Sequence, residues 1–157
     1  MSVHRLNTLV GMSLLVHDET PYVRRVLRSV VSGEGLRAVD SSEDFSTLTN
    51  RIWALRPDII VLSWEPGQSD RIELVQMIRS GYRDMDPQTR IIAATACSQI
   101  EFIKSLSKIG ANGVILKPFN AKTVLTQVQR MGEQRIAYRQ RQLEEATHAF
   151  SGLAFRG

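Results

Sequence analysis

Short apolar runs alternate with amphipathic segments along most of the chain. Five runs have the length of buried strands, at about residues 13–16, 36–39, 59–62, 90–95 and 113–116. Between these runs, apolar residues recur at the three- and four-residue spacing of one helix face, most clearly from Val23 to Val31. The pattern predicts helices over about residues 21–31, 70–81 and 100–109, and a fifth helix that begins near residue 120. Ser41, Ser42 and Asp44 are expected to open another helix, which carries apolar residues from Phe45 to Leu55.

Strict alternation of strands and helices predicts an α/β fold with a parallel sheet and helices on both of its faces. In such a sheet the working site lies at the carboxyl ends of the strands, close to the point where the strand order reverses. The residues that directly follow the predicted strands are therefore the candidates for chemistry. They are His17-Asp18-Glu19, Ser63-Trp64-Glu65, Thr95-Ala96 and Lys117-Pro118-Phe119.

The most specific motif runs from Gly110-Ala111-Asn112-Gly113 to Lys117-Pro118-Phe119. It resembles the G-A-x-G-x-x-x-K-P-F signature of the response-regulator receiver domain. Thr95-Ala96 and the run from Pro57 to Leu62 fit the same family, and the resemblance covers about residues 12–131. It implies a flavodoxin-like, doubly wound sheet of five parallel strands in the order 2-1-3-4-5, with an extended C-terminal helix in this chain.

The resemblance also implies a phosphorylation pocket, and this chain departs from it at the acidic positions. The position of the phosphoacceptor aspartate holds Ser63, and the first of two metal-binding acidic positions holds His17. Asp18, Thr95 and Lys117 remain at their expected places. In addition, Arg71 replaces a glycine of the family pattern and Val114 replaces a mobile aromatic residue.

These substitutions predict a pocket that neither accepts a phosphoryl group nor binds Mg²⁺ tightly. A serine hydroxyl is a weak nucleophile unless a base activates it, whereas a carboxylate is already ionised at neutral pH. Mg²⁺ prefers hard oxygen ligands, and Ser63 and His17 each remove a carboxylate. Without a metal, Lys117 is expected to bond Asp18 or a backbone carbonyl, with Thr95 nearby. We predict no bound metal and no cofactor.

Two residues of the predicted pocket have alternative interpretations. His17 is either a ligand or pH sensor, or a residue that fills space and hydrogen-bonds Asp18. Trp64 is either an exposed anchor for a partner or an aromatic residue that the family tolerates at this place. Our predicted interaction surface includes Trp64 and Val114, together with three residues of the tail.

The tail is longer than a receiver domain needs. The last helix is expected to continue past Met131 to about His148, and Ile136, Leu143 and Phe150 recur on it every seven residues. A single thin apolar stripe is insufficient for a long coiled coil and favours a docking or dimerising helix. The predicted organisation is a leader at residues 1–11, a receiver-like domain at 12–131 and a helical extension at 132–157.

Composition narrows the class of protein. Of 157 residues, 43% are hydrophobic and 23% are charged, which is ordinary globular usage. One cysteine, Cys97, excludes a disulfide framework, and no apolar run approaches the roughly 20 residues that span a bilayer. We expect a cytoplasmic protein without a signal peptide. The net charge of +4 permits an acidic partner, but a mildly basic domain is common.

The sequence therefore predicts a stand-alone pseudo-receiver that is not an enzyme and acts as an adaptor in bacterial two-component signalling. Its expected partners are a histidine kinase, a phosphotransfer protein or another receiver, and a second copy of itself through the tail. Two alternatives stay open. One is a module that binds a nucleotide second messenger or, less in keeping with the sequence, nucleic acid through basic residues of the first helix or the tail. The other is a conventional phosphoaccepting response regulator.

Overall fold

The computed structural model describes residues 8–154. Strands and helices alternate through the whole described chain, as the sequence pattern predicts. In chain order they are β1 (Ser13–His17), α1 (Pro21–Val31), β2 (Ala38–Ser42), the 3-10 helix η1 (Phe45–Thr47), α2 (Leu48–Leu55), β3 (Ile59–Ser63), α3 (Ser69–Arg79), the 3-10 helix η2 (Tyr82–Asp84), β4 (Arg90–Thr95), α4 (Ile100–Ile109), β5 (Gly113–Leu116) and α5 (Ala121–Ala154).

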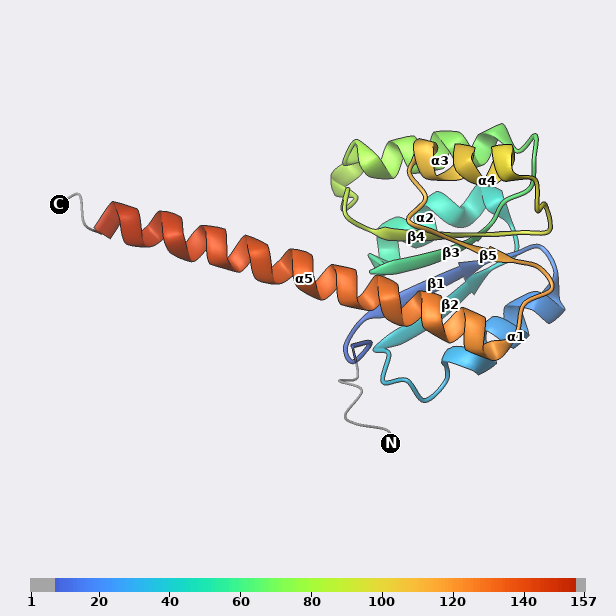
Figure 1. The fold of residues 1–157 in the computed structure, drawn as a ribbon, viewed down its shortest axis with the longest axis horizontal. Helices are drawn as coiled ribbons and strands as arrows, with labels where there is room; N and C mark the ends of the chain where they lie inside the picture. The colour runs from blue at the N-terminus through green and yellow to red at the C-terminus, as the bar shows by residue number, and fades with distance from the viewer. Residues whose placement is uncertain (1–7, 155–157) are drawn as a thin grey trace.

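The five strands form one parallel sheet in the order β2-β1-β3-β4-β5. Helices α1 and α5 cover one face of the sheet, and α2, α3 and α4 cover the other (Figure 1). This arrangement confirms the predicted flavodoxin-like fold and its long C-terminal helix. The strand order reverses between β1 and β3, so their carboxyl ends open onto a shared crevice.

Alternation along the strands divides the core into two clusters. Leu15, Ile60 and Leu62 point to the side of α2, α3 and α4, whereas Leu14 and Val61 point to the side of α1 and α5. Successive side chains of a strand face opposite sides of the sheet, and both sides are covered here, so the central strands are apolar throughout. The same alternation decides where the polar residues at the strand ends point.

The second strand differs from the prediction. We expected it at residues 36–39 and a helix that opens at Ser41 and Ser42, but β2 runs from Ala38 to Ser42. Every residue of β2 is in register with β1, from Ser13 opposite Ala38 to His17 opposite Ser42. An edge strand is half exposed and tolerates polar residues, so its apolar pattern was a poor guide to its position.

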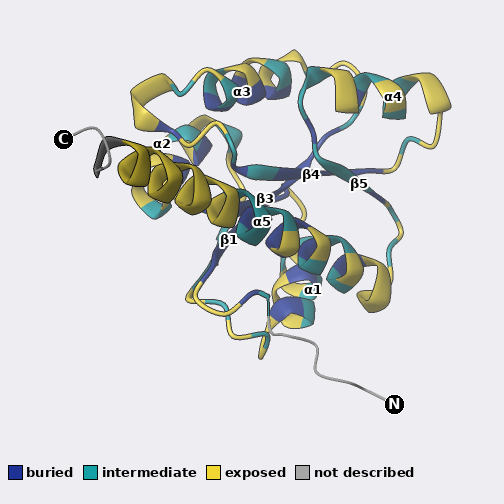
Figure 2. Ribbon diagram, turned by 60° about the vertical axis from the view of Figure 1, so that its left-hand side comes forward, coloured by how far each residue is buried: buried dark blue, intermediate teal, exposed yellow. Residues whose placement is uncertain are grey.

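Helix α5 is attached to the domain over its first half only. Val124, Val128 and Met131 are buried against the sheet, and Gly132 lies so close to Leu9 that an added Cβ would come within 2.8 Å of the leucine side chain. Leu9 belongs to the core cluster on this side, although it falls in the predicted leader; the division into a leader, a domain and an extension stays a prediction. Beyond residue 140 the helix projects from the domain and is exposed (Figure 2). No described helix is both long and apolar enough to cross a membrane.

Candidate functional site

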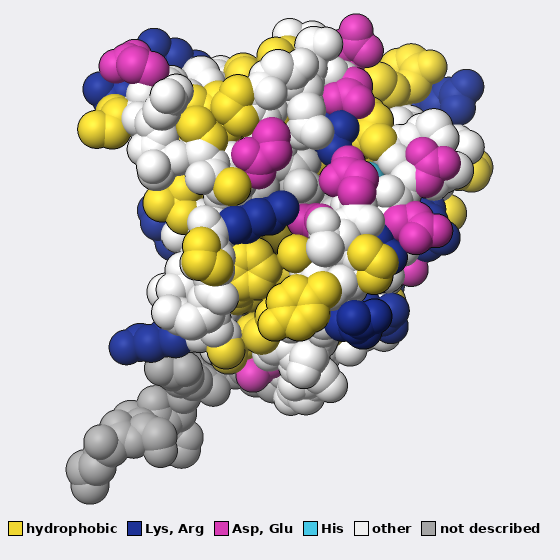
Figure 3. Space-filling view, turned by 90° about the vertical axis from the view of Figure 1, so that its right-hand side faces the viewer, with side chains coloured by type: hydrophobic (Ala, Val, Ile, Leu, Met, Phe, Trp, Pro, Cys, Tyr) yellow, Lys and Arg dark blue, Asp and Glu magenta, His cyan; other side chains and the backbone are white. Residues whose placement is uncertain are grey.

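The carboxyl ends of the strands bring the predicted pocket residues together. Strand pairing places His17 opposite Leu62, Ser63 opposite Ala94, and Thr95 opposite Leu116, which precedes Lys117. Residues from four separate parts of the sequence therefore meet at one edge of the sheet. Figure 3 views the molecule from this end, where acidic side chains gather above an apolar patch.

Lys117 forms the centre of one half of the pocket. Its Nζ donates to Asp18 Oδ2 at 2.7 Å and to Ser63 Oγ at 3.2 Å. Asp18 is buried, and its other carboxylate oxygen accepts the backbone N–H of Thr20 at 2.9 Å. The predicted bond between Lys117 and Asp18 is thus confirmed. It gives a buried carboxylate the cationic partner without which burial would be costly.

Glu65 occupies the other half of the pocket, in a role that its place after β3 did not predict. Its Oε2 accepts the hydroxyl of Thr95 at 3.1 Å, and its Oε1 accepts the backbone N–H of Ala96 at 2.8 Å. The Glu65 backbone N–H donates to Gln68 Oε1 at 2.8 Å, which fixes the loop after β3. Thr95 therefore faces Glu65 instead of the pair formed by Asp18 and Lys117. The available signal was an acidic residue two positions after Ser63.

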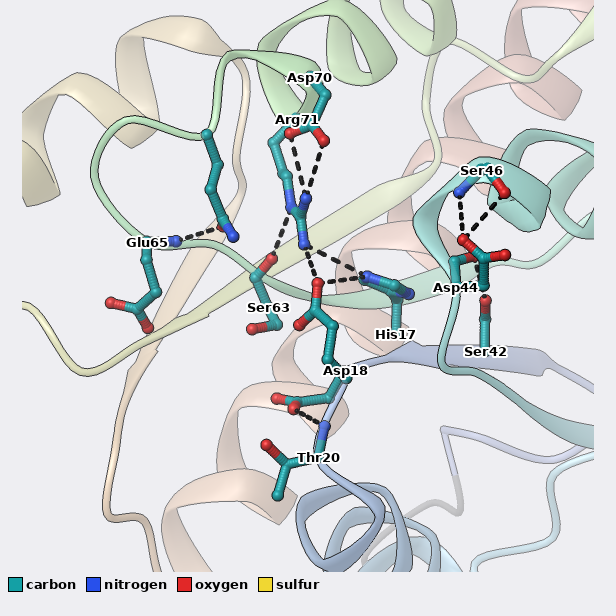
Figure 4. A network of polar contacts seen from close by, with 12 residues as sticks. His17, Asp18, Thr20, Ser42, Asp44, Ser46, Ser63, Glu65, Asp70 and Arg71 are labelled. Carbon is teal, nitrogen blue, oxygen red and sulfur yellow. Dashed lines mark hydrogen bonds and ion pairs between the residues drawn. The ribbon is translucent and has the colours of Figure 1, made fainter.

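Arg71 is a second residue whose role was not predictable from the sequence pattern alone. Its side chain is only 3% exposed and lies at the centre of a polar network (Figure 4). Nε donates to the backbone oxygen of Ser63 at 3.1 Å, Nη2 donates to Glu19 at 2.6 Å, and Nη1 donates to both oxygens of Asp70. The guanidinium also lies 4.3 Å from the ring centroid of Phe45. The replacement of a family glycine by arginine was the signal for this role.

His17 does not bond Asp18, so that interpretation is wrong. Alternation along β1 turns His17 to the opposite side of the sheet, where Nε2 lies 3.3 Å from Arg71 Nη2 and 3.4 Å from Glu19 Oε1. Burial lowers the pKa of His17, and the nearby Arg71 charge lowers it further, against the raising effect of Glu19 and, more weakly, of Asp18. The ring packs edge-on against Phe45, at 5.6 Å between centroids, and its Nδ1 is buried without a partner among the described residues.

Of the predicted interaction surface, only Leu143 and Phe150 at the end of the tail are well exposed. Alternation along the chain places Trp64 beside Ile60 and Leu62 in the core, where it is only 2% exposed. The predicted role of Trp64 as an exposed anchor is therefore wrong. Val114 is half-buried against the same cluster, and Ile136 is half-buried on α5. Leu143 and Phe150 are exposed, at 68% and 74%.

The pocket does not fit the Mg²⁺ ion that receiver domains use. Of the two carboxylates that follow β1, Asp18 is bonded to Lys117 and Glu19 to Arg71. Ser63 offers a hydroxyl that already accepts from Lys117, and Arg71 places a fixed positive charge beside its backbone oxygen. In the described part of the chain, no three His, Cys, Asp or Glu side chains form a group that could hold a metal.

A cavity of about 410 Å³ lies next to Lys117, on the side of α1. Apolar side chains form most of its wall. The cavity lies between the start of α1 and the segment that joins β5 to α5. Its lining consists of Tyr22, Val23, Val26, Ala96, Lys117, Pro118 and Phe119. The Lys117 side chain is thus partly accessible from this side, while Asp18 is buried.

Comparison with known proteins agrees with the geometry. The chemotaxis protein CheY of Listeria monocytogenes is 25% identical over 114 residues, which cover 73% of this chain and 92% of that protein. CheY of Thermotoga maritima is 22% identical over 116 residues, which cover 74% and 93%. The solved structure of the chemotaxis response regulator CheY4 of Vibrio cholerae superposes with a TM-score of 0.68 at 22% identity, over 78% of this chain and 99% of that one.

A second solved structure, of a response regulator from Thermotoga maritima, gives a TM-score of 0.69 at 19% identity, over 79% of this chain and 99% of that one. The structural likenesses support the fold. The sequence profile of the response regulator receiver domain matches residues 14–129, from β1 well into α5. This chain therefore belongs to the response regulator receiver domain family, the receiver domains of two-component signalling.

Proposed function

We propose that this receiver domain works as a protein-interaction module whose signalling state does not depend on phosphorylation. The observation that carries the proposal is the internal pairing of the pocket. Lys117 is bonded to Asp18 and Ser63, and the donors of Thr95 and Ala96 are bonded to Glu65. In the family, the lysine and the threonine or serine interact with the incoming phosphoryl group.

The chemistry of Ser63 supports the same proposal. A serine hydroxyl must lose its proton to a base during nucleophilic attack. The hydrogen bond to Ser63 Oγ comes from the Lys117 ammonium, which donates and therefore cannot take a proton. The imidazole of His17 is directed to Arg71 and Glu19, on the other side of the sheet. No arrangement of a nucleophile and a base is formed by these residues.

Glu65 gives the proposed module a fixed state. The Glu65 carboxylate, a planar monoanion, accepts the Thr95 hydroxyl and the Ala96 N–H, which are donors that a phosphoryl group would otherwise bind. The segment between β4 and α4 is then held permanently by an internal anion. We infer that the surface around this segment is presented to a partner without an input of phosphate.

The proposed partners are a histidine kinase, a phosphotransfer protein or another receiver, met in the cytoplasm, and a second copy of this chain. The dimer would use α5 beyond the domain, where Leu143 and Phe150 are exposed on a projecting helix. An isolated helix is marginal in water, and burial of its apolar stripe against a second copy would stabilise it. The module itself would catalyse no reaction.

The decisive experiment is incubation of the full chain with acetyl phosphate and Mg²⁺, followed by intact mass spectrometry. We expect no mass gain. The matched variant Ser63→Asp restores the acceptor carboxylate but leaves Glu65, Arg71 and His17 in place, so we expect at most partial phosphorylation and weak Mg²⁺ binding. A stoichiometric gain of one phosphoryl group by the unmodified chain would refute the proposal.

A further inference from the structure

A second cavity of about 410 Å³ lies at the opposite end of the sheet from the receiver pocket. Its lining residues lie near the amino-terminal ends of β1 and β3 and on α5. Figure 1 shows that α5 leaves the domain at this end of the sheet. The elements around it are distant in the sequence. Its lining consists of Gly11, Arg37, Ile52, Arg56, Pro57, Asp58, Met85, Asp86, Thr89, Arg135 and Arg139.

The cavity wall carries a surplus of positive charge. Four guanidinium groups face two carboxylates, so two positive charges are left over. Asp58 is buried, accepts the Ser13 backbone N–H at 3.0 Å, and accepts Nη2 of both Arg135 and Arg139. Asp86 pairs with Arg135 at 2.8 Å. Burial opposes its ionisation, but hydrogen bonds from the Gln88 backbone and Arg135 and the charges of Arg135 and Arg139 prevail and lower the pKa of Asp86.

Several of these arginines retain unused donors. Each guanidinium carries five N–H groups. Arg37 makes one long hydrogen bond, of 3.4 Å, to Ser13 Oγ, and Arg56 donates to the backbone oxygen of Asp84 and stacks on Trp53. Neither has a carboxylate partner among the described residues. Nε of the buried Arg135 has no hydrogen-bond partner within residues 8–154.

A purely structural role explains only part of this arrangement. Asp58 and its two arginines fasten α5 to the amino-terminal edge of the sheet, and that clamp is complete without Arg37 and Arg56. Both of these arginines are nevertheless exposed at the cavity, one before β2 and one after α2. Like charges that converge without a counter-ion repel one another, and a bound anion would remove this repulsion.

We propose that this cavity binds a small phosphorylated molecule. Arginine suits phosphoryl oxygens because its planar fork donates two parallel hydrogen bonds to them. A phosphoryl dianion would balance the surplus charge, and the cavity is within the roughly 300–1,000 Å³ range of small-molecule sites, larger than phosphate alone requires. The apolar wall of Ile52, Pro57 and Met85 would contact the body of the ligand. The concave shape favours a small molecule over a polyanionic surface such as duplex DNA.

Helix α5 would take part directly in this binding. Arg135 and Arg139 are four residues apart, so they project from the same face of the helix, one turn after another. Their guanidinium groups already meet at Asp58 Oδ1. A ligand in the cavity would add a second anion to this junction and strengthen the attachment of α5. The site is thus separate from the receiver pocket, and it stands whether or not the proposed function is correct.

Isothermal titration of the full chain with inorganic pyrophosphate, ATP and GTP tests this site. We expect saturable one-to-one binding of at least one of these probes, weakened by added salt. Arg37→Ala with Arg56→Ala should reduce the affinity roughly tenfold or more, because two unpaired phosphate-binding groups are lost. The variant avoids Arg135 and Arg139, so that the clamp on Asp58 stays intact, and a thermal unfolding curve checks its fold.

The matched control is Arg141→Ala, which removes the charge of an exposed arginine outside the cavity. It should leave the affinity unchanged. Equal losses in the cavity variant and the control would show nonspecific charge attraction and overturn the proposal. So would no binding of any probe at millimolar concentration, or binding of duplex DNA with none of the small phosphates.

Discussion

At the scale of single residues, the substitutions in the receiver pocket compensate one another. Ser63 and His17 each stand where the family has a carboxylate, and Arg71 brings a cation where the family has glycine. The remaining carboxylates, Asp18 and Glu19, are each paired with a cation of the chain itself. Lys117 and Arg71 together thus balance the charge of these two carboxylates.

Arg71→Ala should destabilise the fold by about 2–3 kcal/mol, since it leaves the buried Ser63 carbonyl and the Glu19 carboxylate without their donor. The lower end of the range reflects the half-exposed state of both Glu19 and Asp70, which water can still solvate. Urea denaturation measures the change.

Arg25→Ala, which removes an exposed arginine from α1, provides the control and should change the stability little. Arg71→Lys should restore only part of the loss, because an ammonium cannot reproduce the planar fork. If the Arg71→Ala variant were as stable as the Arg25→Ala variant, the hydrogen bonds around Arg71 would not contribute to the stability of the fold.

At the scale of elements, the sequence predicted the central strands well and the edge strand poorly. The apolar run at residues 59–62 lies in β3, which is buried on both faces and begins and ends within one residue of the prediction. β2 pairs on one side only and consists of half-buried residues such as Val39 and Asp40, so its position depends on pairing with β1 instead of on its own pattern.

The length of α5 was predictable, but its partners were not. The periodic apolar positions indicated a helix past Met131, and the structure extends it to Ala154. That Arg135 is buried and bonds Asp58, 77 residues away in the sequence, follows only from the position of the helix on the sheet. Ile136 is half-buried for the same reason, so the fully exposed part of the predicted stripe is Leu143 and Phe150.

The projecting part of α5 should dimerise, and Leu143→Asp should abolish the dimer. A carboxylate in the centre of the contact would have to be buried without a partner, which costs several kcal/mol, more than a small helical contact supplies. Light scattering on the full chain should report the mass of a dimer, and the variant should have the mass of a monomer.

Gln140→Asp is the matched control, because it adds the same charge at an exposed position of α5 outside the apolar stripe. It should leave the dimer intact. If the unmodified chain were a monomer at high micromolar concentration, the predicted dimer would be wrong, and the apolar stripe would have to contact another partner.

At the scale of the whole molecule, the site at one end of the sheet was predictable from the sequence and the cavity at the other end was not. The receiver pocket was found because its residues directly follow strands and match motifs, although the roles of Glu65 and Arg71 required the geometry. The cavity at the other end has no motif. Its arginines come from α5 and from segments beside β2 and α2, and only the packing of α5 across the sheet brings them together.

The global stability should fall on acidification, in two stages. Burial, aided by Arg71, lowers the pKa of His17, so the unfolded chain takes up a proton near pH 6.5 while the folded chain resists it. A group whose pKa is lower in the folded state stabilises the fold above its unfolded pKa, and this stability is lost as the pH falls toward the folded value. The first loss therefore begins below about pH 6.5.

Glu19 and Asp86 cause the second loss at lower pH, and the His17→Gln variant separates the two stages. For both carboxyls, burial opposes ionisation, but hydrogen bonds and the charges of arginines prevail and lower the pKa below the ordinary 4.5 and 3.8. Urea midpoints measured from pH 8 to about pH 3 should be flat above pH 7 and then decline. His17→Gln should remove the decline in stability that begins near pH 6.5, because glutamine does not titrate. The decline at lower pH should remain in this variant. An unchanged slope between pH 6.5 and pH 5 in this variant would show that His17 is not the group that protonates on unfolding.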